Sequence, residues 1–235
     1  MIGCCVRLSA QNVGENRRLA NAFQAVTPTG FTLQAGEISY QNIWLGYNVG
    51  HVGLTDWASI SVAPNLLAFL DEDRAFGVHL TPTVSLPVGE NVRLGVFALL
   101  NIPFESGAES VGGVLGFLTI GNPQGAWLTG SYGSSFSTRG AGNIPLAALS
   151  GGLRVGERVY LVTEHLFLRE RLREFTIEVS TGMLAARWVT RRGPAFDTGI
   201  MTIYELFGAG TWSVPVLPYF GFTIPLRRTS PGGGN

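Results

Sequence analysis

The sequence predicts an all-β protein, a closed antiparallel transmembrane β-barrel of about 12 strands, with 10 strands as the alternative count. Three observations predict it. Apolar side chains recur with a period of two along many segments, which no helix satisfies. The clearest hairpin has arms long enough for a tilted strand of about 9–11 residues to cross a bilayer. Charged residues make up only 14% of the 235 residues, well below the about 25% of soluble domains, so we expect an apolar surface.

The clearest hairpin spans Phe76–Ile102. Apolar residues alternate with smaller or polar ones along its first arm, and after the turn at residues 88–91 the alternation resumes along the second. His79 falls on the polar face of the first arm, and Arg93 on the corresponding face of the second. We therefore expect the apolar faces of both arms to point outward into hydrocarbon and these two side chains to face the lumen.

The rest of the chain repeats this rhythm. We expect the barrel over residues 36–226, an N-terminal segment of residues 12–35 and a flexible tail of residues 227–235. Within the N-terminal segment, the periodic apolar residues Leu19, Ala22, Phe23 and Val26 are compatible with a helix of two turns that caps or precedes the barrel. One long or bulged strand is predicted from residue 36 to 54 and its partner from 57 to 63. Further strands are predicted at residues 111–120, 126–136, 144–154, 159–167, 177–189, 195–203 and 218–225. Single-chain barrels normally have an even number of strands, so the missing one is expected within residues 23–33 or from a break within 38–54.

The connections also alternate in length. Short turns are predicted at residues 88–91, 121–125, 155–158 and 191–194, and longer links at 103–110, 135–143, 168–174 and 206–211. Transmembrane barrels distribute their connections between two rims in this way. Residues 163–175 carry several charges and are compatible with a strand followed by a charged loop or with a short helix on an outer loop.

The first 11 residues look like the end of a secretory signal peptide, with Leu8-Ser9-Ala10 as a small-residue cleavage site before Gln11. A charged n-region is missing, so we expect the true start codon upstream. A lipoprotein acylated at Cys4 and an ordinary N-terminus are the alternatives. The adjacent Cys4 and Cys5 cannot staple the fold, because both precede the patterned region.

Composition excludes other classes. Lys plus Arg and Asp plus Glu both number 16, and no basic stripe is visible, so we expect no nucleic-acid binding. The uncharged stretches at residues 110–138 and 206–226 are interrupted by Gly or Pro, which disfavours membrane helices. The 3 histidines are scattered without the spacing of metal ligands, so neither a metal nor another cofactor is predicted.

Three short stretches carry a family resemblance: residues 27–33 (TPTGFTL), 36–42 (GEISYQN) and 52–60 (VGLTDWASI). Over roughly Thr27–Ile60 the chain resembles a group of uncharacterised outer-membrane β-barrel proteins of Gram-negative bacteria. The resemblance implies a barrel in the cell outer membrane and implies no activity. The chain departs from many such barrels in lacking a terminal aromatic residue, although Phe220 and Phe222 lie in its last predicted strand.

Ionisable side chains in the predicted strands should face the lumen or lie near a rim, because a lipid-facing charge costs about 2–4 kcal/mol at the midplane. The lumen-facing candidates are His79, Arg93, Arg187, Asp197, Glu37, Arg154 and Glu164. In the hairpin of residues 177–203, the turn brings Arg187 and Asp197 opposite each other. Such a pair either fills and rigidifies a narrow barrel or forms a selectivity constriction.

The predicted function is a narrow pore or a passive, structural component of the outer membrane, with membrane lipid and small solutes as partners and no protein partner identified. A soluble lipocalin-like barrel that binds an apolar ligand is the first alternative, and it would need a more polar exterior. An envelope lipid hydrolase is the second. It is disfavoured because no serine lies in a G-x-S-x-G motif and because Glu164 and His165, as neighbours in a strand, point to opposite faces.

Overall fold

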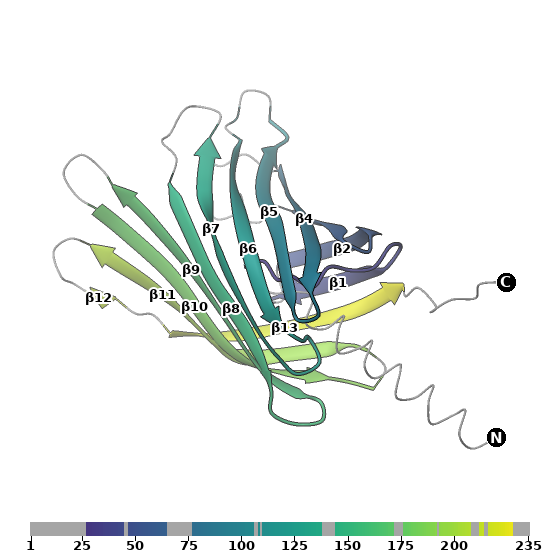
Figure 1. Cartoon of the computed structure of the whole chain (residues 1–235). Coiled ribbons are helices and arrows are strands. Elements are labelled where there is room, and N and C mark those ends of the chain that lie inside the picture. The colour runs from purple at the N-terminus through teal and green to yellow at the C-terminus, as the bar shows by residue number, and fades with distance from the viewer. Residues whose placement is uncertain are drawn as a thin grey trace, which may run out of the picture.

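The computed structural model describes residues 27–44, 47–64, 77–105, 108, 110–137, 144–171, 176–191, 193–207, 212–213 and 216–227. Within these ranges the chain forms strands that belong to one antiparallel sheet (Figure 1). The strands are β1 (Ile38–Ile43), β2 (Tyr47–Thr55), β3 (Ala58–Pro64), β4 (Gly77–Gly89), β5 (Val92–Pro103), β6 (Val111–Gly121), β7 (Ala126–Ser137), β8 (Pro145–Arg154), β9 (Val159–Arg171), β10 (Thr176–Val189), β11 (Ala195–Phe207), β12 (Trp212–Ser213) and β13 (Val216–Arg227).

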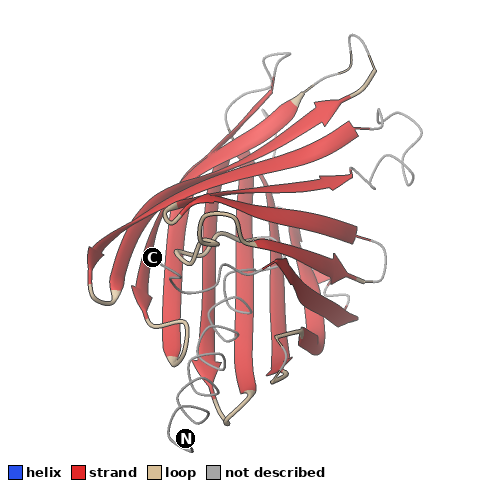
Figure 2. Cartoon of the chain, turned by 90° about the vertical axis from the view of Figure 1, so that its right-hand side faces the viewer, coloured by secondary structure: helices blue, strands red, loops and turns tan. Residues whose placement is uncertain are grey.

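The sheet closes on itself. Neighbours in sequence pair from β1 to β11, β11 pairs with β13, and β13 pairs with β1. The short β12 pairs only at the edge of β11, so the ring consists of 12 strands. The predicted closed antiparallel barrel of 12 strands is therefore confirmed (Figure 2). In the part of the chain that the structure describes, no helix is both long and apolar enough to cross a membrane.

The prediction of a single strand from residue 36 to 54 is wrong. The chain breaks after Ile43, where Trp44 adopts a φ of 53°, in the left-handed region that non-glycine residues rarely occupy. The Trp44 amide donates to the Phe220 carbonyl at 2.8 Å, and its indole Nε1 donates to the Pro218 carbonyl at 2.9 Å. The twelfth strand comes from this break, and the described residues 27–33 form no strand.

The two ends of the barrel differ. The turns at residues 56–57, 90–91, 122–125, 155–158 and between β10 and β11 all lie at one end, which we call the short-turn rim; it faces the bottom and right of Figure 1. The first residue of β1 pairs with Arg227 of β13, so these strand ends also lie at this rim. The longer connections join the strands at the opposite end, the long-loop rim. For residues 163–175, β9 continues as a strand to Arg171, and residues 172–175 lie outside the described residues.

Side chains alternate between the two faces of the wall as the period of two requires. In β6, Leu115 and Phe117 point inward and are each 4% exposed, whereas Val114 and Leu118 point outward and are 42% and 40% exposed. In the hairpin of β4 and β5 the outward residues include Val84, Leu86, Leu94 and Val96, all exposed. The apolar faces of this hairpin thus point away from the barrel interior.

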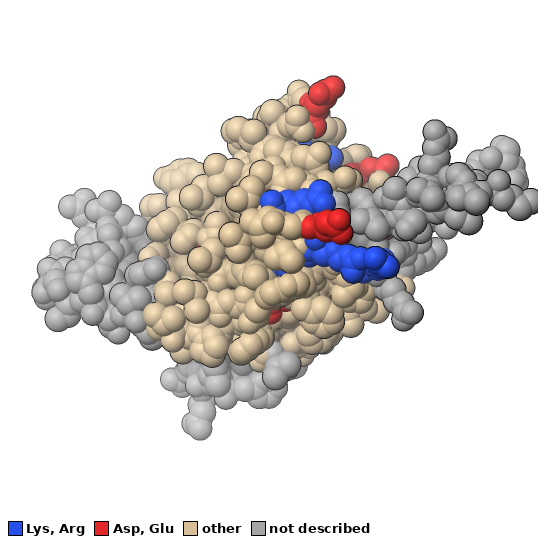
Figure 3. Space-filling view, turned by 90° about the horizontal axis from the view of Figure 1, so that it is seen from below, with Lys and Arg blue, Asp and Glu red and all other residues tan. Residues whose placement is uncertain are grey.

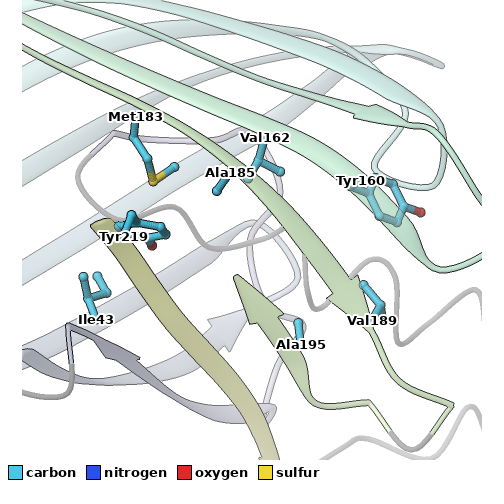
Figure 4. Packing of buried hydrophobic residues seen from close by; sticks show 8 residues of the cluster. All are labelled: Ile43, Tyr160, Val162, Met183, Ala185, Val189, Ala195 and Tyr219. Carbon is cyan, nitrogen blue, oxygen red and sulfur yellow. The ribbon is translucent and has the colours of Figure 1, made fainter. Parts of the chain in front are cut away.

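Part of the interior is filled by side chains. One buried cluster joins the inner faces of β1, β9, β10, β11 and β13 (Figure 4). Its members are Ile43, Tyr160, Val162, Met183, Ala185, Val189, Ala195 and Tyr219. Tyr160, Tyr219 and the separate Trp127 are therefore interior residues. Of the aromatic side chains near strand ends, Trp44, Trp57 and Trp188 are exposed instead.

Candidate functional site

Residues 27–34, which we call the plug segment, lie inside the barrel before the chain enters β1. The side chains of Thr27, Thr29, Phe31 and Leu33 are between 1% and 6% exposed, although the segment belongs to no strand. The residues of this segment therefore occupy the lumen. The short helix that we expected around Leu19, Ala22, Phe23 and Val26, capping or preceding the barrel, lies outside the described residues.

The inner end of the plug segment is held by β9 and β8. The backbone amide and the hydroxyl of Thr27 donate to the same oxygen of Glu164, Oε2, at 3.0 and 3.1 Å. Ser150 donates to the carbonyl of Pro28 at 3.1 Å. A carboxylate that accepts two hydrogen bonds is a strong anchor, because hydrogen bonds to charged groups are about twice as strong as neutral ones.

The middle of the segment passes close to the inner wall. Ser85 of β4 donates to the Gly30 carbonyl at 2.7 Å. A Cβ atom at Gly30 would lie 2.7 Å from the Cβ of Thr119 on β6, so only glycine fits without displacing the segment. The ring of Phe31 meets Trp127 of β7 edge to face, with the centroids 5.7 Å apart. Thr119 also shares a hydrogen bond of 2.6 Å with Thr129.

The outer end of the segment reaches the short-turn rim at the turn between β2 and β3. Thr32 donates to the carbonyl of Asp56 at 3.3 Å, and the Ala35 amide donates to the Asp56 carboxylate at 3.2 Å. Glu37 is fully buried, and its carboxylate accepts from the Gln34 amide at 2.6 Å. The plug segment thus runs from β9 across the lumen to the opposite part of the wall.

A buried ion pair lies on the inner wall near the anchored end of the plug. Arg187 Nε donates to Asp197 Oδ1 and Arg187 Nη2 donates to Asp197 Oδ2, both at 2.7 Å. The side chains are 0% and 3% exposed, and Glu164 and Tyr219 are close enough to interact electrostatically with the guanidinium group. This bidentate geometry is the strongest that an arginine and a carboxylate form. The pair joins β10 to β11 inside the barrel.

A cavity of about 420 Å³ lies between the plug segment and the short-turn rim. Phe31, Thr32 and Gln34 of the segment form part of its lining, and the turns of β2–β3, β4–β5 and β6–β7 form the rest. Arg93 lines this cavity together with Asp56 and Glu90. The cavity is within the size range of small-molecule sites, about 300–1,000 Å³, and its wall toward the lumen is the plug itself.

The other predicted site residues lie apart from this centre. His79 is half-buried, and its Nδ1 lies 3.2 Å from the Tyr47 hydroxyl oxygen. Arg154 is exposed at the short-turn rim, where its Nε donates to the Gly156 carbonyl at 2.9 Å. Glu164 faces inward, and the neighbouring His165 faces outward next to Thr163. Glu164 and His165 therefore cannot act together on one face of the wall.

Of the wall residues that contact the plug segment, Glu164 was among the predicted lumen-facing residues, whereas the small polar ones were not found from the sequence. Ser85, Ser150 and Thr119 are small polar residues on inward faces, and many such residues line any barrel with a polar interior. One feature of the sequence could have indicated a segment inside the barrel. Small side chains recur on the inward faces of several strands near the short-turn rim, and they leave room for another segment.

The chain matches no family model, no curated protein and no solved structure. The fold and the site together define a 12-stranded β-barrel whose lumen is crossed by a segment of its own chain.

Proposed function

We propose that this chain is an integral outer-membrane β-barrel protein of the Gram-negative envelope and that it acts as a narrow pore held closed by its plug segment. The observation that carries the proposal is the chemistry of the outer wall. Of the outward-facing strand side chains that the structure describes, none is charged, and most are apolar. The exposed ones include Val84, Leu94, Val96, Leu118, Leu128, Leu149, Leu153, Leu161, Leu184, Phe196, Ile200 and Phe220.

Such an outer wall suits hydrocarbon better than water. A closed barrel satisfies every backbone group between its strands and leaves no edge exposed, which is what a bilayer demands of a β-structure. Exposed charged residues are found instead at the rims: Glu90, Arg154, Glu157 and Arg191 at the short-turn rim, and Glu105 beyond the end of β5 at the long-loop rim. Figure 3 views the molecule from below. The resemblance over roughly Thr27–Ile60 supports the same location. A soluble lipocalin-like barrel would place its polar residues on this wall and its apolar residues inside.

Location is tested by fractionation. We expect the protein to sediment with outer membranes, to need detergent for extraction, and to migrate faster on gels before heating than after, as compact barrels do. Monodisperse protein recovered without detergent would overturn the membrane proposal and favour the soluble binder.

Pore activity is tested in planar bilayers with purified protein. Because the plug segment narrows the lumen, we expect small, infrequent conductance steps. Arg93→Ala should change their size or ion selectivity, since Arg93 lines the cavity at the short-turn rim. Steps that are identical in the variant would show that ions take another path, and complete silence of the wild type would favour a purely structural role.

A further inference from the structure

Among the described strands of the ring, β1, β2 and β3 are the shortest, so the part of the wall that they form is the lowest. These strands have 6, 9 and 7 residues, whereas every other strand of the ring has 10 to 14. A strand rises about 3.3 Å per residue, so β1 is about 20 Å long. A tilt of about 40° reduces its height to about 15 Å, against an apolar band about 25 Å tall in outer-membrane barrels.

The difference in wall height lies at the long-loop rim, where the described part of β13 extends beyond the end of β1. β1 and β13 end their pairing at Ile43 and Gly221, and residues 216–220 of β13 continue beyond that point, paired with β11 on their other side. On the side toward β1, the amide and indole of Trp44 donate to the carbonyls of Phe220 and Pro218. Trp44 thus satisfies two carbonyls of a strand edge that β1 is too short to cover.

Inward-facing side chains near the long-loop rim are partly exposed, both on β13 next to the low wall and on β5 farther along the ring. Leu217 lies on the inward face of β13, two residues before the fully buried Tyr219, yet it is 38% exposed. Leu99 on the inward face of β5 is similarly exposed, at 39%. Both residues lie farther from the short-turn rim than the wall residues that bind the plug segment.

Part of the inner wall on β5–β9 is apolar. A buried cluster of Leu115, Leu146 and Ala148 is extended by the partly buried Phe97 and Leu166. These side chains belong to the tall part of the wall, across the ring from β1–β3. A solute that enters from the long-loop end therefore meets an apolar surface on the tall wall, the plug segment toward the short-turn rim, and the low wall at β1–β3.

We propose that small, uncharged, apolar molecules leave the lumen sideways, over the low wall of β1–β3, into the hydrocarbon of the outer leaflet. This inference rests on the membrane location in the proposed function and adds a route and a class of solute to it. In this arrangement the plug segment directs the solute, because it blocks the path along the barrel axis and leaves the lateral path open.

The route is tested with a fluorophore attached to single cysteines in a chain carrying Cys4→Ser and Cys5→Ser, reconstituted in vesicles of brominated phosphatidylcholine. Leu217→Cys reports on the inward face next to the low wall. Ser135→Cys, inward on the tall β7, and Phe136→Cys, outward on the same strand, are its controls. We expect bromine to quench the label at position 217 at least twofold more than the label at 135.

The controls separate the two proposals. If the label at 136 is not quenched, the outer wall does not contact lipid and the membrane proposal fails. If the label at 136 is quenched while those at 217 and 135 are equally protected, the barrel is in the membrane but the lateral route is wrong.

The class of solute is tested by uptake of the apolar dye N-phenyl-1-naphthylamine into outer membranes that contain the protein. We expect uptake to be several-fold faster than without the protein and to fall toward that background with Leu217→Arg or the uncharged Leu217→Gln, each checked for barrel assembly by gel mobility. Unchanged uptake in assembled variants would overturn the lateral route for this class of solute.

Discussion

At the scale of single residues, the ion pair of Arg187 and Asp197 is the most demanding feature of the interior. Both side chains are buried, so removing one partner leaves the other charge without compensation, which typically costs about 3–5 kcal/mol. We predict that Arg187→Met lowers the free energy of unfolding by that amount in detergent, measured by denaturant titration. The double variant Arg187→Met, Asp197→Leu should recover much of the loss. A single variant as stable as the wild type would show that the pair contributes no stability.

Residue-scale features differ in how far the sequence could predict them. The hairpin register that places Arg187 opposite Asp197 follows from alternation and a short turn, and the structure brings the two together. The role of Ser85 and Ser150 could not be predicted in this way, because their partners are backbone carbonyls of the plug segment. The type of a residue and the face on which it lies do not determine which distant backbone group will be its hydrogen-bond partner.

At the scale of elements, the plug segment depends on one position without a side chain. A Cβ at Gly30 would collide with Thr119, so we predict that Gly30→Leu pushes the segment away from the wall and raises the conductance in planar bilayers several-fold. Gly130→Leu is the matched control, because a Cβ there would meet nothing within 4 Å and points away from the lumen. Equal currents in both variants would show that the plug does not limit conduction.

A covalent lock tests the same element in the opposite direction. An ideal Cβ at Gly30 lies 3.1 Å from the Cβ of Arg93, a few tenths of an ångström short of the usual spacing of about 3.5–4.5 Å in disulfides. The cysteine at position 30 also meets Thr119, so we expect the reduced protein to have a displaced segment, as in Gly30→Leu. In a chain with Cys4→Ser and Cys5→Ser, we predict that oxidised Gly30→Cys, Arg93→Cys conducts less than the same protein after reduction, because the disulfide holds the segment at the wall. Each single-cysteine variant serves as a control. Current that is insensitive to reduction would place the ion path away from the plug.

The sequence predicted strands more readily than the segments between them. A strand with one apolar face shows a period of two, whereas the plug segment forms no regular element, so its burial leaves no periodic signal. A break within residues 38–54 was one of the two expected sources of the twelfth strand, but its position at Trp44 was not predicted, because the alternation of faces continues on either side of it. Element boundaries of this kind depend on pairing with β13, which is distant in the sequence.

At the scale of the whole molecule, low charge and long alternating segments were sufficient to predict a closed barrel, because a long sheet with an apolar outer face has no stable open form in lipid. They did not predict that the wall would be low at β1–β3. Wall height depends on where each strand stops pairing with its neighbours, and residues 36–54 show the same alternation whether they form one strand or two short ones.

The last prediction concerns the outer wall as one surface. Leu118 points outward from β6 and is 40% exposed, so Leu118→Arg would place a cation in the hydrocarbon if the proposed location is right. We predict that this variant loses about 2–4 kcal/mol of stability, the cost of an arginine that faces hydrocarbon near the midplane. Gln124→Arg, at an exposed position in the β6–β7 turn at the short-turn rim, is the control and should assemble like the wild type. Folding into lipid vesicles, followed by gel mobility against denaturant concentration, measures both. Equal stability of the two variants would mean that the outer wall faces water, since a surface arginine costs almost nothing there.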